Sequence, residues 1–589
     1  MFPKLKPLYP YMLRYWRGYA WGCLCTIVAN LIWVQFPRVI GFAISDLSIR
    51  VTWQKILGYA GLIIGITLAH GIMLFWMRWI LIGISRDIEF DLRNDLFSQL
   101  EKQAASYYHE HRTGDIMARM TNDLAAVRML LGPAIMYTAN TVLFSVLALY
   151  YLVRISPWLT LTALAPMPLA SVLIQVMGRK IHDRFEHIQA MFSDISAQAQ
   201  ENFSGARLVR AFAQEEAQIR AFERSNQEYI RRALRLVRLM GMLWPTLEFM
   251  LGVGMVIALL VGGHEVLTHR ISIGNFVAFT MYLQMLMWPI IALGYVVNLF
   301  ERGTASVGRI HELLIAEPTI DDRDAVLATE QVNVQGEVEF RDLHFAYPLA
   351  TGAAKPVEVL HGISLRIPAG SSLALVGPTG SGKSSLVSLI PRLYDAPPGT
   401  VLIDGRPIRE YPLDALRAAI SLVPQETFLF STSIRDNIAF GVEGADPAEV
   451  QRAAQAAHIR AEFELFPNAF ETMVGERGLT LSGGQKQRTA LARAVLRNPR
   501  ILILDDALAS VDTYTEERIL QELRTVMEGR TTILISHRIS TVRHADRIAV
   551  LVRGRIAELG THEELLALGG YYASLFQKQL LEEELAVTG

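Results

Sequence analysis

Long apolar stretches alternate with polar segments through the first 300 residues of the chain. Six of these stretches carry few charged residues, and each has about 20 residues or more, enough for a helix to cross a hydrocarbon core of ~30 Å. They cover Tyr19–Ile44, Ile56–Ile84, Pro133–Val153, Trp158–Met177, Met242–Gly262 and Ile273–Leu299. The pattern therefore predicts six transmembrane helices.

Two of the polar segments between these stretches, 85–132 and 178–241, are much longer than the others. Both are rich in Arg, Glu and Gln. Apolar residues recur in the first segment at helical spacing, at Ile88, Leu92, Leu96 and Leu100. We expect helices 2 to 5 to continue far beyond the bilayer on the cytosolic side. The alternative, a pair of independent soluble insertions, is disfavoured because few turn signals interrupt the helical pattern.

The residues before the first apolar stretch carry positive charge. The first 17 residues contain Lys4, Lys6, Arg14 and Arg17 and no acidic residue, which places the N-terminus in the cytosol. The first apolar stretch is too long for the apolar part of a signal peptide. Because six spans return the chain to its starting side, we expect the C-terminus to be cytosolic as well.

The composition changes after Glu301. A charged linker, 304–335, separates the membrane domain, 1–303, from a region of soluble α/β pattern, 336–589. In this last region Leu373–Val376 and Ile501–Leu504 are short and wholly apolar, as is typical of buried parallel strands. The predicted fold class is a membrane α-helical domain followed by a C-terminal α/β domain.

The overall composition excludes several classes of protein. Of the 589 residues, 51% are hydrophobic and 19% are charged, so intrinsic disorder is excluded. The 56 Lys and Arg against 57 Asp and Glu leave no basic excess, so we expect no nucleic-acid partner. The two cysteines, Cys23 and Cys25, are too few for a disulfide scaffold.

The apolar segment Leu373–Val376 leads directly into a glycine-rich phosphate-binding sequence. Gly377-Pro-Thr-Gly-Ser-Gly-Lys-Ser384 fits the pattern GxxxxGK[ST], and an apolar helix pattern follows it. Backbone N–H groups of such a loop surround phosphate oxygens, the lysine reaches the β- and γ-phosphates, and the serine ligates Mg²⁺. The predicted ATP-binding residues are Gly377, Pro378, Thr379, Gly380, Ser381, Gly382, Lys383, Ser384 and Ser385.

A second apolar strand, Ile501–Leu504, ends at Asp505. An acidic residue at the C-terminal end of a buried strand is where phosphate-loop domains hold magnesium. We therefore predict Asp505 as a second magnesium ligand beside Ser384. Another acidic residue, Asp506, follows it.

The segment Leu481-Ser-Gly-Gly-Gln-Lys-Gln-Arg488 lies between the phosphate loop and Asp505, and it resembles the signature motif of ATP-binding cassette (ABC) proteins. The other motifs stand in the order of that family. Tyr347 resembles the aromatic residue that stacks on adenine, Gln425 the residue that senses γ-phosphate and magnesium, and His537 the switch histidine. Two further segments, Glu476–Gly478 and Ala509–Asp512, look like the exporter-specific loop and the D-loop.

Segments in the membrane half resemble one group of exporters within this family. Tyr107–Asp123 and Val209–Glu215 look like the two coupling segments of multidrug-resistance-like exporters of the MdlA type, and Glu301–Gly303 and Ile501–Ala507 also read like that group. The resemblance implies a half-size exporter of the bacterial cytoplasmic membrane that works as a dimer. It also implies that the second coupling segment sits on the partner's cassette.

In the family fold each ATP lies between the phosphate loop of one chain and the signature of another. The resemblance therefore implies that Ser482, Gly483, Gly484 and Gln485 contact ATP bound by a partner chain. One position departs from the pattern. Most members carry Glu where this chain has Asp506, and in those members the Glu polarises the attacking water. Because Asp is one methylene shorter, we predict a slow site and a heterodimer with a second half-transporter. An active homodimer is the alternative.

Nothing in the sequence specifies the cargo. Polar residues in or near the apolar stretches are candidates for function because burying them in lipid is costly, namely His70, Arg78, Glu248, Gln284 and Asn298. On resemblance we expect amphipathic drugs or other hydrophobic compounds. The alternatives are a lipid or lipid-precursor flippase and an ATP-gated channel or regulator with the same motor.

Overall fold

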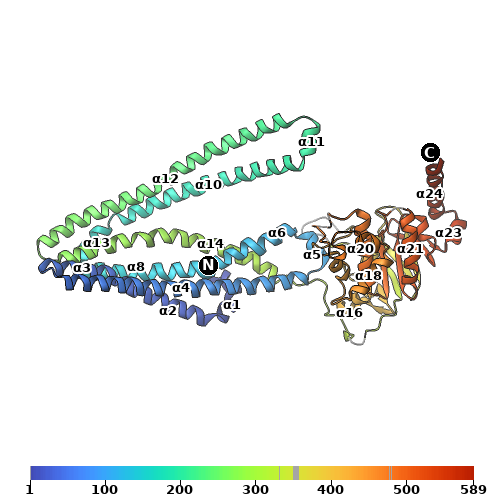
Figure 1. The fold of residues 1–589 in the computed structure, drawn as a ribbon, viewed down its shortest axis with the longest axis horizontal. Coiled ribbons are helices and arrows are strands. Elements are labelled where there is room, and N and C mark those ends of the chain that lie inside the picture. The colour runs from blue at the N-terminus through green and yellow to red at the C-terminus, as the bar shows by residue number, and fades with distance from the viewer. Residues whose placement is uncertain are drawn as a thin grey trace. The chain divides into compact units, whose positions relative to one another are not determined.

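The computed structural model describes residues 2–329, 332–348, 357–475, 478, 480–511 and 513–588 (Figure 1). The chain forms two compact units. The first consists of residues 1–98 and 117–315, and the second of residues 99–116 and 316–589.

The first unit is helical throughout. Up to residue 315 the helices are η1 (Phe2–Leu8), α1 (Tyr9–Arg14), α2 (Trp16–Trp33), α3 (Gln35–Ile49), α4 (Trp53–Glu101), α5 (Ala105–Glu110), α6 (Thr113–Ala118), η2 (Arg119–Asp123), α7 (Leu124–Met129), η3 (Leu130–Ala134), α8 (Ile135–Ile155), α9 (Pro157–Leu164), α10 (Met167–Ser204), α11 (Ala206–Ala211), α12 (Glu215–Leu267), α13 (Ile273–Met285) and α14 (Met287–Leu314). Of these, α5 and the parts of α4 and α6 within residues 99–116 belong to the second unit. The elements η2 and η3 are single π-helical turns within an otherwise α-helical segment.

All six predicted spans lie on helices. Among the described residues, five helical segments are long and apolar enough to cross a membrane: Trp16–Ile49, Trp53–Glu101, Thr113–Ile155, Glu215–Leu267 and Ile273–Leu314. The predicted fourth span, Trp158–Met177, is not one continuous helix, because a turn at Ala165 and Pro166 separates α9 from α10. A proline has no N–H to give to the preceding helical turn, which accounts for the break at this point.

The two long polar segments are mostly helical, as the spacing of their apolar residues predicts, although residues 102–104 and 111–112 interrupt the helices of the first segment. Helix α4 runs without interruption for 49 residues, from the second apolar stretch to Glu101. Helices α10 and α12, of 38 and 53 residues, lie side by side and are joined at their ends by the short helix α11 (Figure 1). Independent soluble insertions are therefore excluded for these segments.

One buried carboxylate ties two helical segments of the first unit together. The π-helical turn η2 carries Asp123, whose side chain accepts hydrogen bonds from Ser306 Oγ at 2.9 Å and from Arg309 Nε at 2.8 Å. Both donors lie on α14.

The second unit contains two sheets. A four-stranded antiparallel sheet has the order β2-β1-β4-β5, and a six-stranded sheet has the order β10-β9-β3-β8-β7-β6. In the larger sheet only β10 is antiparallel to its neighbour, among the pairings described. The strands are β1 (Val338–Ala346), β2 (Glu358–Ile367), β3 (Ser372–Val376), β4 (Val401–Ile403), β5 (Arg406–Pro407), β6 (Ile420–Val423), β7 (Ile501–Asp505), β8 (Thr531–Ile535), β9 (Arg547–Val552) and β10 (Arg555–Gly560).

The central strands of the larger sheet are buried along their whole length, as their apolar sequences predict. Helices cover the sheet, which gives the α/β fold expected from the sequence. They are α15 (Lys383–Ser388), η5 (Ile408–Glu410), α16 (Leu413–Ala418), α17 (Ile434–Ala439), α18 (Pro447–Ala456), α19 (Arg460–Glu464), η6 (Ala469–Glu471), α20 (Gly483–Leu496), α21 (Thr513–Met527), α22 (Ile539–Val542), α23 (His562–Leu568) and α24 (Tyr571–Thr588).

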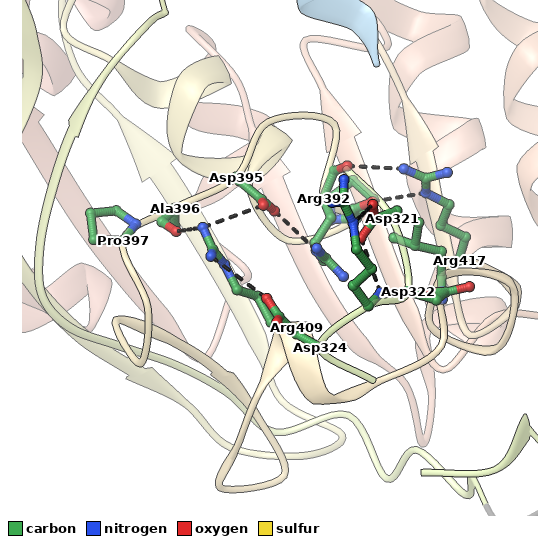
Figure 2. Close-up of polar contacts among 12 residues, drawn as sticks. Asp321, Asp322, Asp324, Arg392, Asp395, Ala396, Pro397, Arg409 and Arg417 are labelled. Carbon is green, nitrogen blue, oxygen red and sulfur yellow. Dashed lines mark hydrogen bonds and ion pairs between the residues drawn. The ribbon is translucent and has the colours of Figure 1, made fainter. Parts of the chain in front are cut away.

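The charged linker is fixed to the α/β fold by a network of arginines and aspartates (Figure 2). Arg409 donates to the carbonyl oxygen of Ala396 at 2.9 Å and pairs with Asp395 at 3.3 Å. Asp395 also accepts from Arg392, whose side chain is buried just after α15. From the linker, Asp322 accepts the backbone N–H of Leu413 at 2.7 Å. The part of the predicted linker that follows Ile315 therefore belongs to the second unit, whereas residues 304–314 continue α14 of the first unit.

We predict that Asp123→Asn destabilises the first unit, because the substitution removes the charge that Arg309 and Ser306 satisfy. The expected loss is about 1–3 kcal/mol, as for hydrogen bonds to charged groups. The measurement is the apparent Tm of the purified protein in detergent. The control is Glu312→Gln, because Glu312 also pairs with an arginine but is largely exposed, and such surface pairs contribute about 0–1 kcal/mol. Equal Tm values for the two variants would contradict the structural role of Asp123.

Candidate functional site

The phosphate-binding loop lies between β3, which ends at Val376, and α15, which begins at Lys383. Two of its glycines are required by the backbone. Gly377 has φ +152° and Gly382 has φ +100°, and a Cβ atom at Gly377 would lie 2.1 Å from the carbonyl oxygen of Leu551. Only glycine fits such a conformation without strain. The loop can therefore turn tightly and point its N–H groups inward.

The side chain of Lys383 is buried beneath this loop. Its ammonium group donates hydrogen bonds to the carbonyl oxygens of Gly377 at 2.9 Å and Pro378 at 3.0 Å. Burial lowers the pKa of Lys383, while the negative charges of Asp505 and Asp506 oppose that shift. The Ser381 hydroxyl is also buried, and it has no partner among the described residues. Such a concentration of donors suits a polyanion such as the phosphate chain of a nucleotide.

The remaining loop residues divide by exposure. Pro378, Thr379 and Gly380 form the exposed tip of the loop. Ser384 is exposed and its side chain hydrogen-bonds to Asp505. Ser385 is buried and accepts a hydrogen bond from the Tyr347 hydroxyl at 2.7 Å.

Three predicted site residues follow neighbouring strands at one edge of the larger sheet. Asp505 ends β7 and lies opposite Ile535 of β8, so His537 follows the next strand at the same edge. Gln425 follows β6, which pairs in parallel with β7 on its other side. Because ligands of open α/β sheets bind at the carboxyl ends of parallel strands, the structure brings the predicted polar groups to the expected place.

Asp505 is buried, and its pKa is raised above the ordinary value of an aspartate. Burial raises the pKa of Asp505 most, and the neighbouring charge of Asp506 adds to the effect. The Ser384 hydrogen bond and the charges of Lys383 and His537 act in the opposite direction. A cation bound at this carboxylate would relieve the cost of burying it.

Asp506 has a left-handed backbone conformation, with φ +49°. Its N–H donates to the carbonyl oxygen of Ile535 at 2.9 Å, which fixes the peptide against β8. Residues other than glycine seldom adopt this conformation, and aspartate does so several times more often than most. Aspartate is therefore the more favourable of the two acidic residues for this backbone conformation.

Tyr347 lies beside the phosphate loop at the end of β1. Its ring meets that of Tyr394 edge to face, with centroids 5.0 Å apart. The hydroxyl of Tyr394 lies 3.0 Å from Nε2 of His109, which belongs to residues 99–116 of the same unit. Sequence reasoning did not identify Tyr394. Its signal is an aromatic residue shortly after the phosphate-loop helix, which has no fixed motif.

The signature segment forms the start of α20. Ser482 caps this helix by accepting from the N–H of Gln485, whose side chain accepts in return from the N–H of Ser482. Gln485 also donates to Glu462, which binds Arg488 through two hydrogen bonds of 2.6 and 3.0 Å. The signature is thus held by the helical part of the unit.

The glycines of the signature lie close to the next loop. A Cβ atom on Gly484 would lie 3.1 Å from the carbonyl oxygen of Ser510, and Ser510 N–H donates to the Gln487 side chain at 2.9 Å. The absence of a side chain at Gly484 therefore lets the start of α20 pack closely against the loop at Ser510, while Gly483 is exposed. Of the other predicted motif residues, Glu476, Arg477 and Asp512 lie outside the described residues.

Comparison with known proteins identifies the class to which this fold and site belong. The family described as the ABC transporter transmembrane region matches residues 19–290, and the family described as ABC transporter matches residues 360–509. The chain therefore belongs to the ABC transporters, as an exporter with a transmembrane and an ATP-binding domain. It is an integral membrane protein that binds ATP and hydrolyses it to drive export.

Three curated relatives cover nearly the whole chain. A probable multidrug resistance ABC transporter ATP-binding/permease protein, YheI of Bacillus subtilis, is 35% identical over 99% of this chain and 98% of its own length. The multidrug resistance-like ATP-binding protein MdlA of Escherichia coli is 33% identical over 98% and 96% of the two chains. An ATP-dependent lipid A-core flippase of Syntrophus aciditrophicus is 35% identical over 96% and 93%. The resemblance to MdlA-type exporters is therefore confirmed.

A solved structure has the same fold. A bacterial Atm1-family ABC exporter with ATP bound superposes with a TM-score of 0.76 at 28% identity, over 96% of this chain and 98% of that chain. The expected succession of a helical membrane region and a C-terminal α/β domain is confirmed by this likeness and by the two family matches.

We predict that Lys383→Ala weakens ATP binding to this chain, because the only ammonium group described beneath the loop is lost. The measurement is photolabelling of the chain by an azido-ATP analogue over a range of concentrations. Lys578→Ala, which removes an exposed lysine on α24, serves as the control. Labelling that Lys383→Ala leaves unchanged would contradict the assignment.

Proposed function

We propose that this chain is one half of a heterodimeric exporter that moves amphipathic drugs or other hydrophobic compounds out across the bacterial cytoplasmic membrane. Both termini lie in the cytosol in this proposal. The names of two relatives, a probable multidrug resistance transporter and a multidrug resistance-like protein, support the class of cargo. The charge of the first 17 residues supports the orientation.

The site residues receive roles from their positions at the sheet edge. Residues Gly377–Ser385 hold the phosphates, and Tyr347 stacks on the adenine beside Ser385. Gln425 and His537 contact the γ-phosphate from the strands on either side of Asp505. Closing of two such cassettes on ATP and their reopening after hydrolysis would alternate access to the cargo path.

Ser384 and Asp505 fit a magnesium ion. Mg²⁺ prefers hard oxygen ligands and is held by one or two protein side chains together with substrate phosphates. The described residues contain no group of three or more His, Cys, Asp or Glu that could hold a metal by themselves. When bound, the ion would neutralise charge on the β- and γ-phosphates. Ser384 and Asp505 would orient it from the protein side.

The need for a second chain follows from the signature and from the membrane helices. Ser482, Gly483, Gly484 and Gln485 present a helix N-terminus whose own contacts run to Glu462 and the loop at Ser510, and in this proposal it meets the ATP held by a partner. In the first unit, the most apolar parts of α4 and α12 are only 6% and 17% buried, against 33–44% for the other spanning segments. A second chain would cover such helices.

Asp506 is the observation on which the heterodimer rests. Its carboxylate is one methylene shorter than the glutamate of most members, and its backbone is fixed in a left-handed conformation that favours aspartate. The carboxylate would be withdrawn by about one C–C bond from a geometry that tolerates roughly an ångström of error. This site would therefore hold ATP longer, while its signature completes a faster site on the partner.

A lipid flippase is the second candidate, because one relative of 35% identity is a lipid A-core flippase. Reconstituted vesicles separate the two functions. ATP-dependent uphill uptake of a cationic dye with no movement of fluorescent lipid supports drug export. Lipid movement without dye uptake supports the flippase.

We predict that Ser482→Ala impairs hydrolysis at the partner's site while this chain still binds ATP. The serine also caps α20, and loss of a cap costs about 1 kcal/mol. Thr561→Ala controls for that cost, because Thr561 forms the same kind of capping box on α23. The measurement combines steady-state phosphate release by the reconstituted pair with azido-ATP labelling of each chain. A defect confined to this chain's own phosphate loop would disprove the arrangement across two chains.

We predict that the chain alone hydrolyses ATP slowly and that a partner with glutamate at this position raises turnover. Loss of a general base costs about 10²–10⁴-fold in rate. In the pair, Asp506→Asn should therefore change turnover little, whereas the equivalent change in the partner should nearly abolish it. The measurement is steady-state phosphate release by the chain alone and by the pair.

Asp506→Glu is the complementary variant. If carboxylate reach limits the rate, it should speed hydrolysis at this site, at some cost in stability from the left-handed backbone. A fast ATPase formed by this chain alone, and silenced by Asp506→Asn, would show instead an active homodimer with an aspartate base.

A further inference from the structure

One polar residue stands in the apolar face of the C-terminal helix α24. Tyr572, Leu575 and Phe576 on this face pack in a core with Ile539 and Val542 of α22. Gln579 follows Phe576 by three positions and Tyr572 by seven, so it belongs to the same face. A glutamine at such a position must satisfy its amide through hydrogen bonds or pay for its burial.

The Gln579 amide makes two hydrogen bonds to the backbone around the switch histidine. Its Oε1 accepts the N–H of Ile539 at 2.8 Å, and its Nε2 donates to the carbonyl oxygen of His537 at 2.5 Å. One side chain therefore holds the peptide groups on both sides of Arg538. Ile539 is also the first residue of α22, so Gln579 satisfies one of the N–H groups that a helix start leaves free.

The same segment is held from a second direction. The Arg538 guanidinium donates to the carbonyl oxygen of Val511 at 3.1 Å and pairs with Glu516 of α21. Thr541 of α22 also donates to Glu516. Arg538 thus connects the segment 537–539 to the loop that follows Asp505, while Gln579 connects the same segment to the C-terminal helix α24.

Helix α24 is itself fixed to the sheet. Glu558 of β10 accepts the N–H groups of Tyr571 at 2.5 Å and Tyr572 at 3.1 Å, and the Tyr572 hydroxyl lies 2.8 Å from Nδ1 of His562. Gln579 therefore stands on a rigid element, and its two hydrogen bonds can define where the backbone of His537 lies.

We propose that Gln579 is a positioning residue for ATP hydrolysis, which acts by holding the backbone of His537 so that its imidazole meets the γ-phosphate. This inference rests on the proposed role of His537. The imidazole is exposed at the end of β8, so the peptide that carries it must set its reach. A displacement of about 1 Å at a reacting centre can cost up to ~10²-fold in rate.

The test is a double-mutant cycle on the full-length chain. Gln579→Ala, His537→Ala and the double variant are compared for single-turnover hydrolysis of labelled ATP and for the Kd of a fluorescent ATP analogue. Gln577→Ala is the matched control, because it removes the same side chain from an exposed position two residues away on the same helix. Single-turnover conditions keep a slow site measurable.

We expect Gln579→Ala to reduce the rate about tenfold with little change in Kd, and Gln577→Ala to change neither. In the His537→Ala background, Gln579→Ala should cause no further loss, because both act through one imidazole. Gln579→Glu keeps an acceptor for Ile539 but replaces the donor to His537 with a carboxylate oxygen that repels the carbonyl oxygen, so it should also show the rate defect.

Three results would overturn the inference. They are an unchanged rate in Gln579→Ala, a loss that persists in full without the imidazole, and a loss explained by weaker ATP binding alone. If His537→Ala itself left the rate unchanged, the role of His537 and this inference would both fail. A fast homodimeric ATPase would contradict the slow-site proposal, but the double-mutant cycle of Gln579 and His537 could still be measured on it. Failure of the slow-site proposal is therefore distinguishable from failure of the role of Gln579.

Discussion

The parallel pairing of β7 with β8 and β6 is the constraint on which the nucleotide site depends. Backbone hydrogen bonds set Asp505 level with Ile535 and Val423 level with Leu504, so the residues that follow all three strands emerge at one edge. A shift of one residue would turn every side chain of a strand to the other face. Because β7 and β8 are buried on both faces, such a shift would place every side chain in a space packed for a different one, which close packing resists.

Much of this arrangement could be predicted from the sequence. The phosphate loop and Asp505 are recognisable because their chemistry needs fixed residue types at fixed spacing beside short apolar strands. The helical nature of the long polar segments followed from the spacing of residues such as Leu92 and Leu96. The geometry of these features comes only from the structure. The left-handed backbone at Asp506, for example, cannot be predicted from the pattern of residue types.

Other features depend on contacts between residues far apart in sequence. Tyr394 and Gln579 have no motif, since each acts through a hydrogen bond or ring contact to a partner that only the fold brings near. The break in the fourth predicted span could not be read from apolar content alone. Pro166 signals a possible break, but Pro157 and Pro168 lie in first turns, where proline is tolerated, so tertiary structure decides which proline interrupts the helix.

The two π-helical turns, η2 and η3, have a consequence for the phase of the helix that carries them. Each such turn accommodates about one residue more than an α-helical turn, and one residue corresponds to a rotation of about 100°. The face that α8 presents is therefore displaced by two such rotations from the face that a regular helix from Thr113 would present. A deletion of one residue at either turn would be absorbed by a return to α-helical geometry, and everything beyond it would keep its orientation. The helix can therefore change its length by one residue at each of two places between Thr113 and α8.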